Sequence, residues 1–196
     1  MPMKWKSSDF GGILLECESG NIAVNGGAPL AELEKFYLPE GKPPAMMIAT
    51  CEHHHRSWNV DRFCLKHHVP LVMPELAAEQ INTEGIQLQT VMVPDTRCFL
   101  KLGVWIALIP VEYDSVEPFC LTVNDAGTMV GIVPDGRIYP DLAKYLLDCD
   151  TVILGNRLPV PGNAATALER RLRNVCNTQS ELDEYFKGYS GETAYI

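Results

Sequence analysis

The chain has 196 residues, of which 46% are hydrophobic and 21% are charged, and these values exclude extensive disorder and predict one globular domain over residues 1–196. Its formal net charge of −9 argues against non-specific nucleic-acid binding, because phosphates are neutralised by clustered Lys and Arg. We expect no signal peptide, because the start Met-Pro-Met-Lys-Trp-Lys has no apolar run. We expect no membrane span, because no apolar run approaches roughly 18 residues. Seven cysteines without a Cys-x-x-Cys pair suit reduced thiols and hence a cytoplasmic protein.

Short apolar or alternating runs between turn residues predict β-strands along the whole chain. In chain order, the expected strands cover residues 13–17, 21–24, 46–49, 71–73, 86–93, 104–109, 119–123, 129–133 and 152–154. Glu18, Ser19 and Gly20 separate the first two of these strands, and their composition predicts a hairpin turn.

Apolar residues at helical spacing predict helices over residues 29–36, 58–67, 140–147, 164–172 and 180–186. Pro29 suits the start of the first helix, where its missing N–H costs nothing. Ser180 followed by Asp183 resembles an N-cap signature for the last helix. Strand-rich halves that are each followed by helices predict sheets with helices on their outer faces, in an α/β or α+β sandwich.

Residues 50–58, Thr-Cys-Glu-His-His-His-Arg-Ser-Trp, follow a buried strand, where proteins commonly present reactive side chains on a loop. If residues 51–55 are extended, Cys51, His53 and His55 lie on the same side of the chain. A thiolate and two imidazoles suit Zn²⁺, which prefers sulfur and nitrogen ligands. The alternative is a polar surface loop whose histidines are only solvated.

The order of these segments resembles the metallo-β-lactamase fold, and most closely its small phosphodiesterase and nuclease-like branch. The stretch Thr-Cys-Glu-His-His-His-Arg resembles the family's Thr-His-x-His-x-Asp-His motif after a strand. Residues 11–27 resemble the opening hairpin, with Asn25 in place of an Asp. Residues 116–136 resemble a later strand pair and the segment that supplies a bridging carboxylate. Residues 148–156 resemble a late strand, with Gly155 in place of a Glu.

The resemblance implies a four-layer αββα sandwich of metallo-β-lactamase type, and it implies where the metal ligands would fall. The family's ligand positions are occupied here, in chain order, by Cys51, His53, His55, Arg56, Asn124, Asp135 and Asn177. Only His53 and Asp135 keep the family's residue type, and all five histidines of the chain lie before Val69. We therefore expect the two-metal centre, which would activate water in that family, to be lost.

Arg56 is the most consequential replacement, because a permanent cation cannot coordinate a metal and would repel one. We expect it to pair with Asp135 or to bind an anion, and Asn124 and Asn177 are further candidates for binding an anion or another ligand. The alternative is a reduced site for one zinc ion, whose ligands would be Cys51, His53, His55 and Asp135.

The sequence thus favours a pseudoenzyme, a non-catalytic binding or partner protein without a cofactor. Its old active-site cleft would hold an anionic small molecule or another protein, and it could also form a homo-oligomer. The alternative is a divergent metal-dependent hydrolase of phosphodiesterase type with the single zinc site. A third interpretation is an unrelated sandwich whose histidine loop is incidental.

Overall fold

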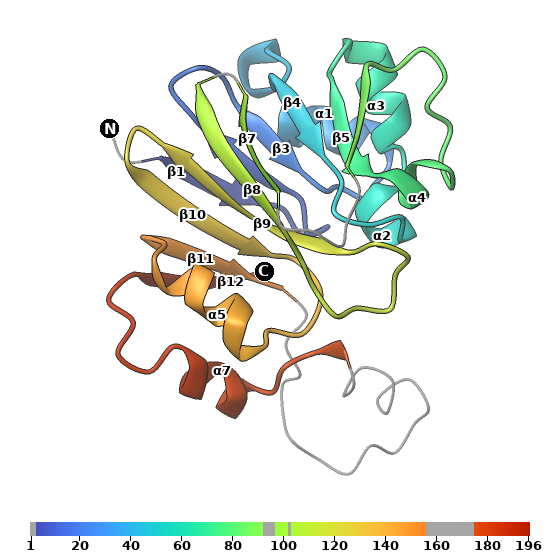
Figure 1. The fold of residues 1–196 in the computed structure, drawn as a ribbon. Helices are drawn as coiled ribbons and strands as arrows, with labels where there is room; N and C mark the ends of the chain where they lie inside the picture. The colour runs from blue at the N-terminus through green and yellow to red at the C-terminus, as the bar shows by residue number, and fades with distance from the viewer. Residues whose placement is uncertain (1–2, 92–96, 102, 156–174) are drawn as a thin grey trace.

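The computed structural model describes residues 3–91, 97–101, 103–155 and 175–196. Within these ranges the strands form two six-stranded sheets (Figure 1). The first sheet has the order β1-β2-β3-β4-β5-β6, with strands at Lys4–Ser7, Ile13–Glu16, Ile22–Val24, Met46–Ile48, Leu71–Pro74 and Leu88–Val91. The second has the order β12-β11-β10-β9-β8-β7, with strands at Glu192–Tyr195, Thr151–Leu154, Thr128–Val133, Phe119–Asp125, Val104–Pro110 and Arg97–Lys101.

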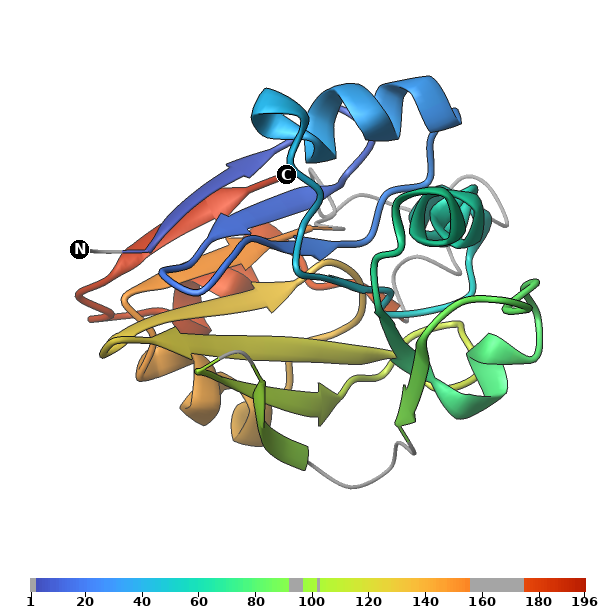
Figure 2. The same ribbon diagram turned by 90° about the horizontal axis from the view of Figure 1, so that it is seen from above.

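Helices cover the outer face of each sheet (Figure 2). The first sheet carries α1 (Leu30–Tyr37), the 3₁₀ turn η1 (Pro39–Gly41), α2 (His54–Ser57), α3 (Val60–His67) and α4 (Glu75–Ala78). The second sheet carries α5 (Pro140–Leu147) and α7 (Gln179–Tyr185). This arrangement is the four-layer αββα sandwich that the resemblance implies.

The alternation of side chains along the strands places the cores. In β2, Ile13 and Leu15 face the core between the two sheets, whereas Leu14 faces the helices, as a period of two residues requires. All three side chains are fully buried. Burial on both faces explains why the inner strands are continuous apolar runs, and such runs are recognisable in the sequence.

Every expected strand is present in the described residues, with small differences at the ends. The strand expected over residues 86–93 is shorter, as β6 at Leu88–Val91, and positions 92–93 lie outside the described residues. The predicted hairpin is confirmed, because β2 and β3 pair antiparallel around residues 18–20. Three strands were missed: β1, β7 and β12. The strands β1 and β12 are edge strands with exposed ends, so they lack the apolar run that marks an inner strand.

Three helices differ from the prediction at their ends. The helix expected over residues 29–36 is Leu30–Tyr37, with Pro29 as its N-cap. The helix expected over residues 58–67 begins at Val60, because Asn59 adopts a left-handed conformation (φ 61°) and its side-chain amide donates to the Ala28 carbonyl. The last helix is capped by Thr178 rather than Ser180, since Thr178 and Glu181 form a reciprocal capping box. The helix expected over residues 164–172 lies outside the described residues.

The carboxyl ends of neighbouring strands meet at one edge of the sandwich. The strands β3, β4 and β5 are parallel, so the loop over residues 50–58 follows β4 at the same edge where β3 and β5 end. The Phe119 amide at the start of β9 donates to the Thr50 carbonyl over 3.3 Å, which joins the two sheets at this edge. Asp135 follows β10 by two residues, and the candidate site is built here.

Candidate functional site

The turn after β3 supports the loop over residues 50–58. Asn25 is fully buried with φ 58°, and its Oδ1 accepts hydrogen bonds from the Thr50 amide (2.9 Å) and hydroxyl (3.0 Å). Asn is among the few residues that tolerate this left-handed conformation. Gly27 then lets the histidine loop lie directly on the turn, because a Cβ there would come within 2.2 Å of the His55 carbonyl carbon.

A buried ion pair between Arg56 and Asp135 occupies the centre of the site. Arg56 Nε donates to Asp135 Oδ2 at 2.5 Å, and Nη2 donates to Oδ1 at 2.9 Å. This bidentate geometry is the strongest form of the arginine–carboxylate interaction. The two side chains are only 8% and 4% exposed. The pairing of Arg56 with Asp135, one of the two roles that the sequence suggests for Arg56, is confirmed.

Two backbone carbonyls complete the coordination of the guanidinium. Arg56 Nη2 donates to Pro134 O at 2.8 Å, and Nη1 donates to Gly11 O at 3.2 Å. Gly11 has φ +72°, and a Cβ there would lie 2.2 Å from Arg56 Nη1. Arg56 therefore holds together three segments from both sheets: its own loop, the turn before β2 and the segment after β10.

Arg56 and Asp135 each stabilise the charged state of the other. Burial alone would lower the pKa of Arg56, but the hydrogen bonds and negative charge of Asp135 outweigh burial and raise it. Burial would likewise raise the pKa of Asp135, yet the nearby His55 ring and the hydrogen bonds and charge of Arg56 lower it. A guanidinium and a carboxylate that are both charged neutralise each other within the site.

The three histidines have different surroundings. The rings of His53 and His55 lie with their centroids 5.6 Å apart, and His55 Nε2 is 3.6 Å from Asp135 Oδ1. The ring of His54 stacks on Trp58 at 4.7 Å. The alternation that would align Cys51, His53 and His55 does not apply, because residues 54–57 form helix α2 rather than a strand.

Tyr113 belongs to the site, although the sequence reasoning did not select it. Its ring lies 5.2 Å from the His53 ring, and it stands in the loop between β8 and β9. The sequence shows that Tyr113 lies in a loop between two strands. It does not show which loops meet at the edge where the strands of the first sheet end. Glu52 anchors this loop, because its carboxylate accepts from the Ser115 hydroxyl (2.5 Å) and the Val116 amide (3.3 Å).

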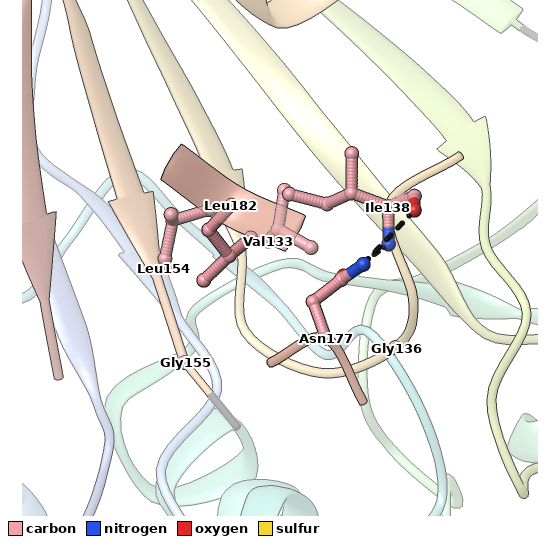
Figure 3. Close-up of a pocket in the computed structure, with 7 residues that line it drawn as sticks. All are labelled: Val133, Gly136, Ile138, Leu154, Gly155, Asn177 and Leu182. Atoms are coloured by element: carbon pink, nitrogen blue, oxygen red, sulfur yellow. Dashed lines mark hydrogen bonds between the residues drawn. The ribbon is translucent and has the colours of Figure 1, made fainter. Parts of the chain in front are cut away.

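The two candidate asparagines lie in different places. Asn177 is close to the segment after Asp135, but its amide is engaged by one residue. Its Oδ1 accepts from the Ile138 amide at 2.6 Å and its Nδ2 donates to the Ile138 carbonyl at 3.2 Å (Figure 3). Asn124 lies near the β9–β10 turn, where its Oδ1 accepts from the Gly127 amide, at the opposite end of these strands from Asp135. Anion binding by Arg56, Asn124 and Asn177 remains a prediction.

Gly155, at the position where the resembled family has a Glu, has no room for a side chain. A Cβ would lie 2.2 Å from the Pro134 carbonyl oxygen. The residues beside it enclose a cavity of about 10 Å³ (Figure 3), lined by Val133, Gly136, Ile138, Leu154, Gly155, Asn177 and Leu182. A cavity of this size accommodates about one water molecule.

The donor set at this edge does not fit a metal ion. In the part of the chain that the structure describes, no three His, Cys, Asp or Glu side chains are grouped so that they could hold one. Both Asp135 oxygens already accept from Arg56. Burial, followed by the Asp135 charge, raises the pKa of the Cys51 thiol to about 12 and opposes the thiolate that a metal needs. The one buried side-chain atom without a partner in the described residues, Asn25 Nδ2, is a donor and cannot ligate a cation.

Solved structures with this architecture identify the fold. The metallo-β-lactamase fold protein YhfI from Bacillus subtilis superposes with a TM-score of 0.68 at 13% identity, covering 94% of this chain and 88% of that one. A diphosphatase from the PhnP family gives a TM-score of 0.67 at 12% identity, with 94% and 72% covered. The short form of human tRNase Z gives 0.65 at 12% identity, with 94% and 88% covered. The chain has the metallo-β-lactamase fold.

The chain resembles these proteins in structure rather than in sequence. The sequence matches no protein-family model and no curated protein. The neighbours include a diphosphatase and a tRNase Z, and the resemblance seen in the sequence to the phosphodiesterase and nuclease-like branch agrees with them. Among the described helices, none has the length and apolar character that crossing a membrane requires.

Proposed function

We propose that the chain is a non-catalytic binding or partner protein of the metallo-β-lactamase fold. The observation that carries this proposal is the bidentate ion pair between Arg56 and Asp135, buried where the resemblance places metal ligands. A guanidinium held by a carboxylate and two backbone carbonyls supplies the positive charge that Asp135 needs. A metal ion would have to displace this cation and break its four hydrogen bonds.

The same network bears on what the site binds. Arg56 has five N–H groups, and its donated hydrogen bonds go to Asp135, Pro134 and Gly11. Its charge is matched by Asp135, so an anion gains little from it. Of the two occupants that the sequence suggests, a protein is therefore the better supported, and an anionic small molecule becomes an outcome of the tests.

The alternative function is a divergent hydrolase with one zinc ion at Cys51, His53, His55 and Asp135. It draws support from the nearness of the His53 and His55 rings and of His55 to Asp135. It also requires the Cys51 thiolate, which burial disfavours, and an Asp135 oxygen released by Arg56.

Metal content and hydrolysis distinguish the two functions. The protein would be purified without chelator, its zinc measured by mass spectrometry, and hydrolysis of bis(p-nitrophenyl) phosphate followed with and without added Zn²⁺ or Mn²⁺. The variant His53→Ala/His55→Ala removes both imidazoles and leaves the ion pair intact. The matched control is His54→Ala/His68→Ala, at two exposed histidines outside the four-residue ligand set.

We expect no stoichiometric zinc and no metal-dependent hydrolysis in the wild type or in either variant. One zinc per chain, lost in His53→Ala/His55→Ala but kept in the control, together with zinc-dependent turnover, would establish the hydrolase instead.

A further inference from the structure

Three large apolar side chains are exposed on the segments around the candidate site. Trp58, after α2, is 41% exposed, Leu76 in α4 is 43% and Val116 between β8 and β9 is 51%. Glu117 Oε2 accepts from the Leu76 amide at 2.9 Å, and Glu52 Oε1 from the Val116 amide at 3.3 Å. The loop after β8 therefore runs beside both α4 and the histidine loop, as Figures 1 and 2 show. We call Trp58, Leu76 and Val116 the loop face.

The segments that carry the loop face are negatively charged. The segments that carry it, residues 50–58, 74–79 and 111–118, contain one Lys or Arg, which is the buried and paired Arg56. Their carboxylates are Glu52, Glu75, Glu79, Glu112, Asp114 and Glu117. The other titratable side chains there are Tyr113 and the three histidines, with Cys51 buried. These acidic side chains, which we call the rim, share their segments with the exposed apolar groups and are complementary to a positively charged partner.

The structure also holds these groups in place before any partner binds. The ring of His54 stacks on Trp58 with an interplanar angle of 21°, which favours this orientation of the indole. Glu52 ties down the loop of Val116 through Ser115 as well as through the Val116 amide. Side chains and loops that are already ordered lose little entropy on binding.

We propose that the loop face binds a basic protein segment that carries an apolar side chain between Lys or Arg residues. The apolar side chain packs against Trp58, Leu76 and Val116, and the basic residues pair with the carboxylates of the rim. Exposed tryptophans with a polar surround are the usual anchors of such interfaces. This inference rests on the proposed function, because it assigns a partner class to the same edge of the fold.

Binding of defined peptides to the full-length protein tests the inference. The probes are a short fluorescein-labelled peptide of alternating Lys and Leu, its counterpart of Glu and Leu, and inorganic phosphate as a competitor. The apolar variant is Trp58→Ala, with Trp105→Ala on β8 as its control, since Trp105 is also exposed at 53%. The charge variant is Glu75→Lys/Glu112→Lys, with the exposed Glu184→Lys of α7 as its control.

We expect the Lys/Leu peptide to bind in fluorescence anisotropy, and Trp58→Ala to weaken it by about tenfold or more, as anchor residues do. The charge variant should also weaken binding by about tenfold, and raised salt should do the same. The two control variants should leave binding unchanged, and so should inorganic phosphate when the ionic strength is held constant.

The inference is overturned if the Lys/Leu peptide does not bind, if the Glu/Leu peptide binds equally well, or if Trp105→Ala weakens binding as much as Trp58→Ala. It is also overturned if sedimentation shows that a second copy of the chain covers the loop face, seen as a dimer that Trp58→Ala dissociates. These readouts do not depend on zinc content or hydrolysis, so the inference can fail while the proposed function stands, and the reverse.

Discussion

Replacing Arg56 by Met should destabilise the protein more than almost any other single change in the site. The substitution keeps an unbranched side chain about as long as the stem of Arg but leaves Asp135, with its side chain 4% exposed, as a charge without its cation. It also removes the donors to Pro134 O and Gly11 O. Breaking a buried ion pair by removing one partner costs about 3–5 kcal/mol, against a total stability of roughly 5–15 kcal/mol for a domain.

A double-mutant cycle separates the ion pair from the rest of the effect. Urea unfolding, followed by circular dichroism at neutral pH, would give the free energy of unfolding for wild type, Arg56→Met, Asp135→Leu and the double variant. Each single variant should lose about 3–5 kcal/mol, whereas replacing a whole buried pair by apolar groups is often neutral or stabilising. The double variant should therefore be more stable than either single variant. A loss below about 1 kcal/mol in Arg56→Met, or additive losses in the double variant, would refute the assigned role of the pair.

Three further predictions concern pH and local geometry. The pKa of Asp135 is lower in the folded protein than in the unfolded chain. Its contribution to stability is therefore present above the unfolded pKa of about 3.9 and is lost as pH falls through the folded pKa. The unfolding free energy of Asp135→Asn, measured from pH 7 to 3, should fall less steeply than that of wild type. Gly11→Ala should lower the free energy of unfolding in urea by at least about 1–3 kcal/mol, because the φ of residue 11 is +72° and the new Cβ would meet Arg56. In the Arg56→Met background this loss should be smaller. An equal loss would count against the contact between residue 11 and Arg56. Thr178→Ala removes the cap of α7 and should lower the unfolding free energy by about 0.5–2 kcal/mol, while Ser180→Ala, the cap predicted from sequence, should change it by less.

The inner strands and the main helices could be predicted because their burial leaves a pattern in the sequence. In β4, Met46, Met47 and Ile48 are all buried between a helical layer and the opposite sheet, so the strand is an uninterrupted apolar run. The missed β1 has the sequence Lys-Trp-Lys-Ser, with exposed ends and half-buried middle positions. Its pairing with β2 comes from backbone hydrogen bonds, which any side chain allows.

The site was predictable only where charge decides the outcome. A buried Asp135 requires a cation nearby, and Arg56 is the cation that the matched motif supplies, so their pairing follows from electrostatics alone. The contact between Tyr113 and His53 follows from how the loop after β8 folds over the edge, which no local pattern encodes. The extended conformation that would place Cys51, His53 and His55 on one side was wrong, because α2 begins at His54.

The ion pair and the loop face together suggest how such a site can bind a partner without catalysing a reaction. Arg56 is permanently charged, so the charge balance of Asp135 is met within the chain and does not depend on the supply of a metal. The network joins segments from both sheets and so can hold the loops at this edge in place. On the proposed function, the groups left to act at the surface are those outside the network: Trp58, Leu76, Val116 and the acidic side chains beside them. Their chemistry selects a partner that is both basic and apolar, and it would keep a phosphate ester away from the edge where the resembled family binds metal.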